Sequence, residues 1–246
     1  MNPRSLLLLA GLIAAPASHA AVVTYDFTAT VSSMFEYERD VEKITTVTSS
    51  TMTGRLIANG QTIRGKFSYD TQTPLSPYYQ PEQPAGGSYQ LYMGSPNNTI
   101  ELIYDVDGYR FQSSRDPLSG LIQVKNVLSG TDYDIFSMNG STGYQPVNFE
   151  TASLMLFNQT GAAFTGPDIP GNLNFADFGY AHIDYGWLRQ ADGNQVHADA
   201  TITSMSLTVA DVPEPDVGFL IALGLGALAI SRCQRDRESA PPRDAG

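Results

Sequence analysis

The central part of the sequence predicts an all-β fold, an antiparallel β-sandwich or jelly roll. Four stretches mix β-branched and aromatic residues with alternating polarity: Val22–Phe27, Leu56–Asp70, Thr99–Gln112 and Thr201–Val209. Dipeptides that tolerate positive φ and close tight turns occur at Asn59-Gly60, Asp107-Gly108, Asn139-Gly140 and Asp192-Gly193. Since no stretch shows a capped helical period or a βαβ rhythm, an antiparallel all-β architecture is expected.

The first 20 residues have the pattern of a secretory signal peptide. Arg4 precedes an apolar run from Leu6 to Ala15, and the small-residue sequence Ser18-His19-Ala20 follows it. A buried core helix or a membrane anchor is the alternative, but the apolar run is too short to span a bilayer. We therefore expect cleavage between Ala20 and Ala21, with a secreted β-domain over residues 21–211.

The composition of this domain excludes several classes of function. Residues 21–211 hold nine Lys and Arg against twenty Asp and Glu, so the domain repels phosphate backbones and nucleic acid is not expected as a partner. The chain's single cysteine, Cys233, lies outside it, which excludes a disulfide within the domain. Only His182 and His197 are present there, which excludes a multi-histidine metal site, and no cofactor is expected.

Two segments of the domain are predicted to be irregular. Thr71–Ser88 contains four prolines, which are incompatible with a central strand. Gly161–Gly171 is a second Gly- and Pro-containing loop. Loops on a β-scaffold often carry binding residues, although their more common role is to join strands.

The C-terminal segment has three parts in a fixed order. Val212, Pro213, Glu214 and Pro215 form a stiff acidic segment, Val217–Ile230 is uncharged, and Arg232, Arg235 and Arg237 follow. Because the uncharged run is apolar on all sides, it favours a separate transmembrane helix over an ordinary C-terminal helix of the domain. Its fourteen residues are fewer than the ~20 of a full span, as suits a transient anchor. The arginines place the last residues, 238–246, in the cytoplasm as a disordered tail.

This arrangement at residues 212–237 resembles the PEP-CTERM sorting signal of exopolysaccharide-associated proteins in Gram-negative bacteria. The resemblance implies that an exosortase, a membrane protease-transpeptidase, recognises the signal and releases or transfers the protein. It covers about 25 of the 246 residues, and a signal peptide stands at the other end of the chain. The implied partners are signal peptidase, the exosortase and the membrane before sorting. The implied destination is the cell surface or the extracellular medium.

Two groups of polar residues in the domain are candidates for chemistry. Asp105, Asp107 and Gly108 could begin a calcium loop, but the remaining ligand positions of that pattern are missing, so a plain Asp-Gly hairpin is the competing interpretation. Strand alternation places His182 and Asp184 on one face, with Asp177 close in sequence. A hydrolase also needs a nucleophile and an oxyanion site, and no GxSxG motif is present.

Aromatic residues offer a third candidate site. Tyr180, Tyr185 and Trp187, together with Tyr78 and Tyr79 of the proline-rich loop, could form a platform on which sugars stack. The alternative is burial in the core, where β-sandwiches commonly place aromatic rings.

Three functions follow from the sequence. The first is an exported, non-enzymatic protein of the cell surface or extracellular matrix, with a structural role in biofilm or exopolysaccharide. The second is a carbohydrate-binding module that uses the aromatic platform, and the third is a secreted polysaccharide hydrolase.

Overall fold

A computed structural model of the chain describes residues 22–77, 87–105, 108–127, 133–143 and 147–208. Residues 20–211 form one compact unit. None of the helices in these described ranges is long and apolar enough to cross a membrane. The predicted cleavage site and the entire C-terminal signal lie outside the described residues.

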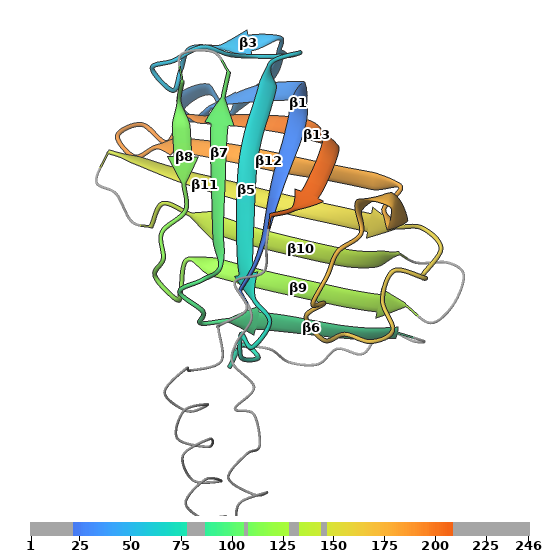
Figure 1. Ribbon diagram of the computed structural model, residues 1–246. Helices are drawn as coiled ribbons and strands as arrows, with labels where there is room; N and C mark the ends of the chain where they lie inside the picture. The colour runs from blue at the N-terminus through green and yellow to red at the C-terminus, as the bar shows by residue number, and fades with distance from the viewer. Residues whose placement is uncertain (1–21, 78–86, 106–107, 128–132, 144–146, 209–246) are drawn as a thin grey trace, which may run out of the picture. The chain divides into compact units, whose positions relative to one another are not determined.

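The described part of residues 20–211 is almost entirely antiparallel β-structure, which confirms the predicted class (Figure 1). Its strands are β1 (Val22–Glu38), β2 (Lys43–Val47), β3 (Ser49–Ser50), β4 (Ile57–Ala58), β5 (Thr62–Asp70), β6 (Gly87–Met93), β7 (Thr99–Tyr104), β8 (Arg110–Gln112), β9 (Gly120–Val127), β10 (Asp134–Ser141), β11 (Asn148–Asn158), β12 (Tyr180–Arg189) and β13 (Gln195–Leu207). Two short 3-10 helices are η1 (Arg39–Val41) and η2 (Phe175–Asp177).

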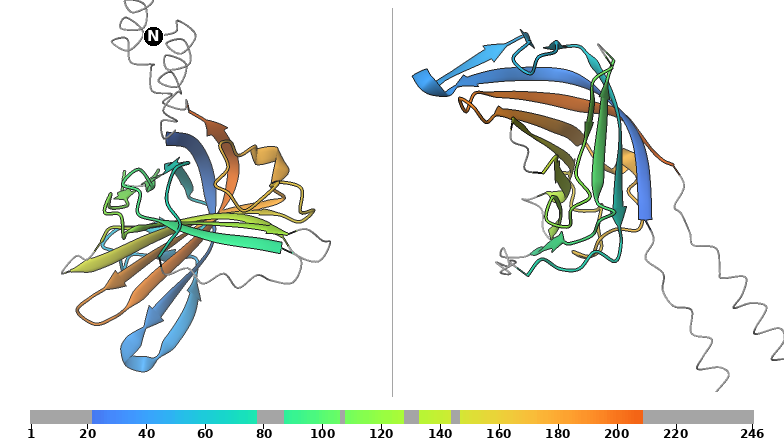
Figure 2. Two further views of the ribbon diagram at one scale, coloured as in Figure 1. Left: turned by 90° about the horizontal axis from the view of Figure 1, so that it is seen from below. Right: turned by 90° about the vertical axis from the view of Figure 1, so that its left-hand side faces the viewer.

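One curled sheet contains eleven of these strands, in the order β6-β9-β10-β11-β12-β13-β1-β5-β7-β8, with β2 beside β1. Strands β3 and β4 form a separate two-stranded sheet. The curl brings β5, β7 and β8 across the face of β9 to β12, as Figures 1 and 2 show. The two halves thus pack like the layers of a sandwich, but they belong to one continuous sheet rather than to two separate ones.

The long strands β1 and β13 explain this continuity. β1 has 17 residues and pairs with both β13 and β5, so the two halves share it. The pairing of β1 with β13 shifts register between Thr28 and Ala29 and again between Val31 and Ser33. Because bulges of this kind bend a strand and increase its twist, they allow β1 to follow the curl from one half to the other.

The core fills the space inside the curl. Alternate residues of strands such as β5, β7 and β11 point inward, as the period of two requires, and aromatic rings from the two halves meet there. Phe136 of β10 lies with its ring centroid 5.2 Å from that of Tyr69 and 6.4 Å from that of Phe67, both on β5. All three side chains are fully buried.

The loop between β11 and β12 covers one end of this core. Tyr25, Tyr69 and Tyr92 donate hydroxyl hydrogen bonds to Asn172 Oδ1 (2.9 Å), Pro170 O (3.0 Å) and Pro167 O (2.8 Å). The buried Asp134 accepts the backbone N–H groups of Ala163 and Phe164. The predicted irregular segment Gly161–Gly171 is therefore a loop, and core phenols satisfy its backbone carbonyls.

Turn predictions agree with the structure at three positions and fail at one. Gly60, Gly108 and Gly193 all have positive φ in turns. Asn139-Gly140, however, lies inside β10. A Cβ at Gly140 would lie 2.7 Å from Ser113 Cβ, so the glycine is needed for close packing of the two halves rather than for a turn.

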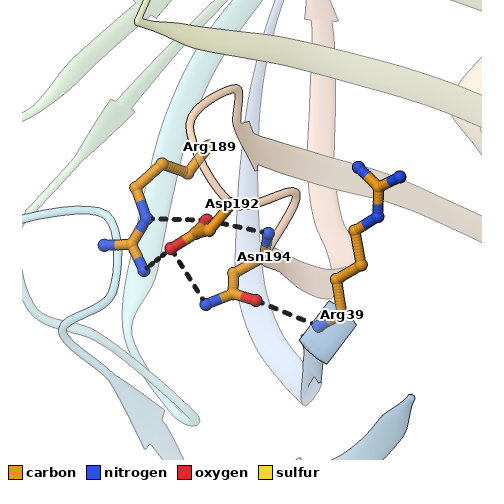
Figure 3. Close-up of polar contacts among 4 residues, drawn as sticks. All are labelled: Arg39, Arg189, Asp192 and Asn194. Carbon is orange, nitrogen blue, oxygen red and sulfur yellow. Dashed lines mark hydrogen bonds and ion pairs between the residues drawn. The ribbon is translucent and has the colours of Figure 1, made fainter. Parts of the chain in front are cut away.

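The turn from β12 to β13 carries a polar cluster (Figure 3). Arg189 contacts Asp192 through Nε (3.0 Å) and through a second guanidinium nitrogen (2.7 Å). Asp192 also accepts the backbone N–H of Asn194 (3.0 Å), and Asn194 Oδ1 accepts the backbone N–H of Arg39 (3.0 Å). The cluster ties this turn to η1 at the far end of β1.

The chain enters and leaves the sheet at adjacent places. Tyr25 of β1 pairs with Leu207 of β13, and the backbone N–H of Thr208 donates to Thr24 O at 2.8 Å. The segments that precede β1 and follow β13 therefore attach to neighbouring points of the same strand pair.

Candidate functional site

The surface that combines polar and aromatic side chains is the outer face of strands β6 and β9 to β13, the side opposite the core. Paired residues form a row across these six strands, perpendicular to them: Met93, Leu121, Asn139, Ser153, Asp184 and Asp199. With strands about 4.8 Å apart, the row extends over roughly 24 Å. We call it the polar row, since four of its six side chains are polar.

A groove of about 430 Å³ follows most of this row. Its lining includes Met93, Leu121, Asn139, Ser153, Asp184 and His197. Ser153 Oγ donates a hydrogen bond to Asn139 Oδ1, which orients both side chains along the groove. Hydroxyl, amide and carboxylate groups between aliphatic walls are the usual means of binding a polar ligand with a defined orientation.

Gly186 shapes the end of the groove. A Cβ there would lie 2.7 Å from Thr151 Oγ1 and 3.5 Å from His197 Cε1, so a side chain would fill the space between these two lining residues. His197 in turn stacks on the half-exposed Phe35 of β1, with ring centroids 4.5 Å apart and planes 10° apart. The stacked rings give that end of the groove a flat wall.

An aromatic patch lies beside the groove on the same face. It consists of Tyr133, Phe157, Tyr180 and His182. The Phe157 ring centroid lies 6.2 Å from that of Tyr133, 5.6 Å from that of Tyr180 and 5.7 Å from that of His182. Tyr133 is 45% exposed and Tyr180 is 46% exposed. His182 lies two residues from Asp184 on the same face of β12, so the patch adjoins the polar row.

The predicted platform of Tyr180, Tyr185 and Trp187 is not one surface. Tyr185 and Trp187 are only 1% and 4% exposed and belong to the core, whereas Tyr180 points outward. Strand alternation already separates position 180 from positions 185 and 187. The ring neighbours of Tyr180 are His182 on its own strand and Phe157 of β11, and only the strand register reveals the second of these. Tyr78 and Tyr79 lie outside the described residues.

His182 and Asp184 share the outer face, as alternation predicts, but they do not form a catalytic pair with Asp177. Asp184 Oδ1 lies 3.8 Å from His197 Nδ1, and Asp177 lies in η2, where it contacts Asn174. The Nδ1 atom of His182 is buried without a hydrogen-bond partner. His182 is therefore not oriented by an aspartate in the way that lets a histidine activate a nucleophile.

The calcium-loop interpretation gains no support either. Arg64 donates to the Asp105 carboxylate at 3.0 Å, Gly108 has φ 58° in the turn between β7 and β8, and Asp107 lies outside the described residues. Within the described ranges, no group of three or more His, Cys, Asp or Glu side chains could hold a metal ion. The hairpin interpretation accounts for what is described of this segment.

A tyrosine–glutamate cluster, which the sequence did not indicate, lies near the start of β11. Tyr109 and Tyr185 both donate their hydroxyl groups to Glu150 Oε2, the latter at 2.9 Å. The buried Tyr104 hydroxyl beside them has no hydrogen-bond partner. Burial and the neighbouring Glu150 carboxylate raise the pKa of Tyr185 far above its ordinary value, and burial likewise raises that of Tyr104. Both phenols remain protonated inside the fold, and that of Tyr185 donates its hydrogen bond to Glu150.

Comparison of the chain with known protein families, with curated proteins and with solved structures finds no match.

Proposed function

We propose that this chain is an exported, non-enzymatic protein of the cell surface or extracellular matrix, sorted by a PEP-CTERM-type signal, and that its β-domain binds polysaccharide. Export is supported by the two sequence signals and by the compact unit of residues 20–211, which leaves both of them out. β1 begins beside the end of β13, so a C-terminal tether would join the domain next to its first strand. The rest of the domain surface then stays accessible.

The observation that carries polysaccharide binding is the groove of the polar row next to the aromatic patch. Sugar rings have apolar faces that stack on aromatic rings and hydroxyl groups that exchange hydrogen bonds with polar side chains. The outer face offers Tyr133, Phe157 and Tyr180 for the first, and Asn139 and Ser153 for the second. An open groove across six strands suits an extended polymer rather than a small enclosed ligand.

Sorting is tested in a bacterial host that carries an exosortase. The full chain is expressed with and without the enzyme, and the C-terminal peptide is followed by mass spectrometry. We expect residues after the Pro213–Pro215 segment to be lost only when the exosortase is present, and Glu214→Ala to retain them. An intact C-terminus in the presence of an exosortase that processes its own substrate contradicts the sorting proposal.

Polysaccharide binding is tested with the purified full chain on an array of glycans. Tyr180→Ala is expected to weaken binding about tenfold, which equals ~1.4 kcal/mol, because tyrosines are enriched among the interface residues whose truncation costs most. Ile44→Ala is the control, since Ile44 is exposed on β2 away from the aromatic patch. Absence of binding to every glycan, or equal losses in both variants, contradicts this proposal, and turnover of a bound polymer contradicts its non-enzymatic part.

A further inference from the structure

We infer that the groove selects polysaccharides with free amino groups, that is, cationic hexosamine polymers. This inference rests on the proposed function and names its substrate class. Its origin is one feature of the polar row: Asp184 of β12 and Asp199 of β13 lie directly opposite each other on the outer face. Residues paired in this way have Cβ atoms about 5 Å apart, and like charges at that position destabilise a sheet.

The immediate surroundings do not neutralise this aspartate pair. The hydroxyl of Ser32 donates to Asp199 Oδ1 at 3.3 Å, a neutral contact. His197 Nδ1 lies 3.8 Å from Asp184 Oδ1 and offsets its charge only when the ring is protonated. Among the described residues, the groove lining contains no lysine or arginine, and the Asp184 side chain is 43% exposed toward solvent. The negative charge therefore remains available to a ligand.

A second groove, on the outer face of β13, β1, β5 and β7, shows the opposite arrangement. Its volume is about 330 Å³, and its acidic residues are paired. Lys66 Nζ lies 3.0 Å from Asp26 Oδ1, and an Arg110 guanidinium nitrogen lies 2.6 Å from Glu101 Oε1. The same sheet thus matches acids with bases on one half, whereas in the described part of the other half no lysine or arginine pairs with Asp184 or Asp199.

Two acidic side chains alone would not define a site. Here Asp184 lines the 430 Å³ groove, Asp199 flanks it as the last member of the polar row, and the exposed ring of Tyr180 lies four residues from Asp184 on the same face of β12. An ammonium group has three N–H donors and no acceptor, so it can bridge two facing carboxylates with charge-assisted hydrogen bonds. A uronic acid in the same place would add a third negative charge to a domain that is already acidic.

The test compares two ligands with the same backbone. Binding of the purified full chain is measured to a short oligomer of β-1,4-linked glucosamine and to its N-acetylated counterpart, which lacks the charge. We expect at least a tenfold preference for the free amine, decreasing with added salt. Asp184→Asn and Asp199→Asn should each remove most of the preference and leave the melting temperature equal or higher, because the like-charge pair is gone.

Asp26→Asn is the matched control. It changes the net charge by the same amount but lies in the other groove, where Asp26 is paired with Lys66. Its binding should equal that of the unchanged protein; an equal loss in all three variants would assign the preference to overall charge and overturn the inference. Equal or tighter binding of the N-acetylated oligomer overturns the inference while leaving polysaccharide binding intact. Failure of both oligomers and of all other glycans overturns the proposed function itself.

Discussion

The two faces of strand β12 differ in almost every property, although their residues alternate along ten positions. The inner face is buried and includes Tyr185 and Trp187, whereas the outer face presents Tyr180, His182 and Asp184. An aromatic ring on the inner face contributes to the free energy of folding, and one on the outer face is available to a ligand. The face of the strand, rather than the residue type, therefore decides what each aromatic residue does.

The largest expected effect comes from the inner face. Trp187→Ala removes a buried ring and leaves a cavity, so the free energy of unfolding should fall by about 3–5 kcal/mol. Denaturant-induced unfolding followed by circular dichroism measures the loss. Tyr180→Ala on the outer face should change the same quantity by less than about 0.5 kcal/mol. Similar losses in the two variants would show that the two faces do not differ as described.

The inner-face phenols should also make the fold sensitive to alkali. Burial raises the pKa of Tyr104 and Tyr185 above the value of about 10 that each has in the unfolded chain. Below pH 10 both phenols are protonated in either state, and their contribution is complete. Above that pH the unfolded chain releases protons that the folded one retains, so stability decreases by about 1.4 kcal/mol per pH unit for each phenol.

Unfolding measured between pH 8 and about pH 12 tests this expectation. Tyr185→Phe removes one buried phenol and should make the decrease with pH shallower. Tyr180→Phe, on the exposed face, should alter the slope much less. A slope that is unchanged in Tyr185→Phe would mean that this phenol ionises as readily in the folded protein as in the unfolded one.

The class of fold could be predicted because it depends on local information. The predicted strand at Thr201–Val209 and the turn at Asp192-Gly193 are local features, and the structure has β13 as far as Leu207 and a positive φ at Gly193. The single curled sheet depends on bulges in β1 and on pairing between strands distant in sequence, which no local pattern specifies. Asn139-Gly140 shows the limit of such reasoning, since its glycine serves contact with Ser113 rather than a turn.

The candidate site was predictable only in part, for the same reason. Alternation correctly placed His182 and Asp184 together on one face, because that is a property of one strand. Two other features depend on the register between strands: Asp184 pairs with Asp199, and Tyr180 contacts Phe157. The sorting motif Val212–Pro215 stays a prediction from the sequence.

The smallest expected effect is at the turn where β12 ends. A one-residue slip of β12 against β13 would exchange its two faces, so the turn that joins them has a part in defining the site. The guanidinium of Arg189 and the backbone N–H of Asn194 lower the pKa of Asp192 (Figure 3). This carboxylate therefore stabilises the fold above the ordinary carboxyl pKa of about 4, and the contribution is lost as the pH falls through the lower folded value.

Asp192→Asn removes the ion pair but keeps an oxygen that can accept the Asn194 N–H. We expect only a small decrease in melting temperature at pH 7, which disappears at acidic pH where Asp192 of the unchanged protein is itself protonated. The decrease should be far smaller than that in Trp187→Ala, because the buried inner face of β12 fixes the register even when the turn is weakened. Two outcomes would contradict this expectation: a large loss of stability, or a folded Asp192→Asn protein that no longer binds glycan. Either would show that the turn, and not the core, determines which face of β12 is exposed to solvent.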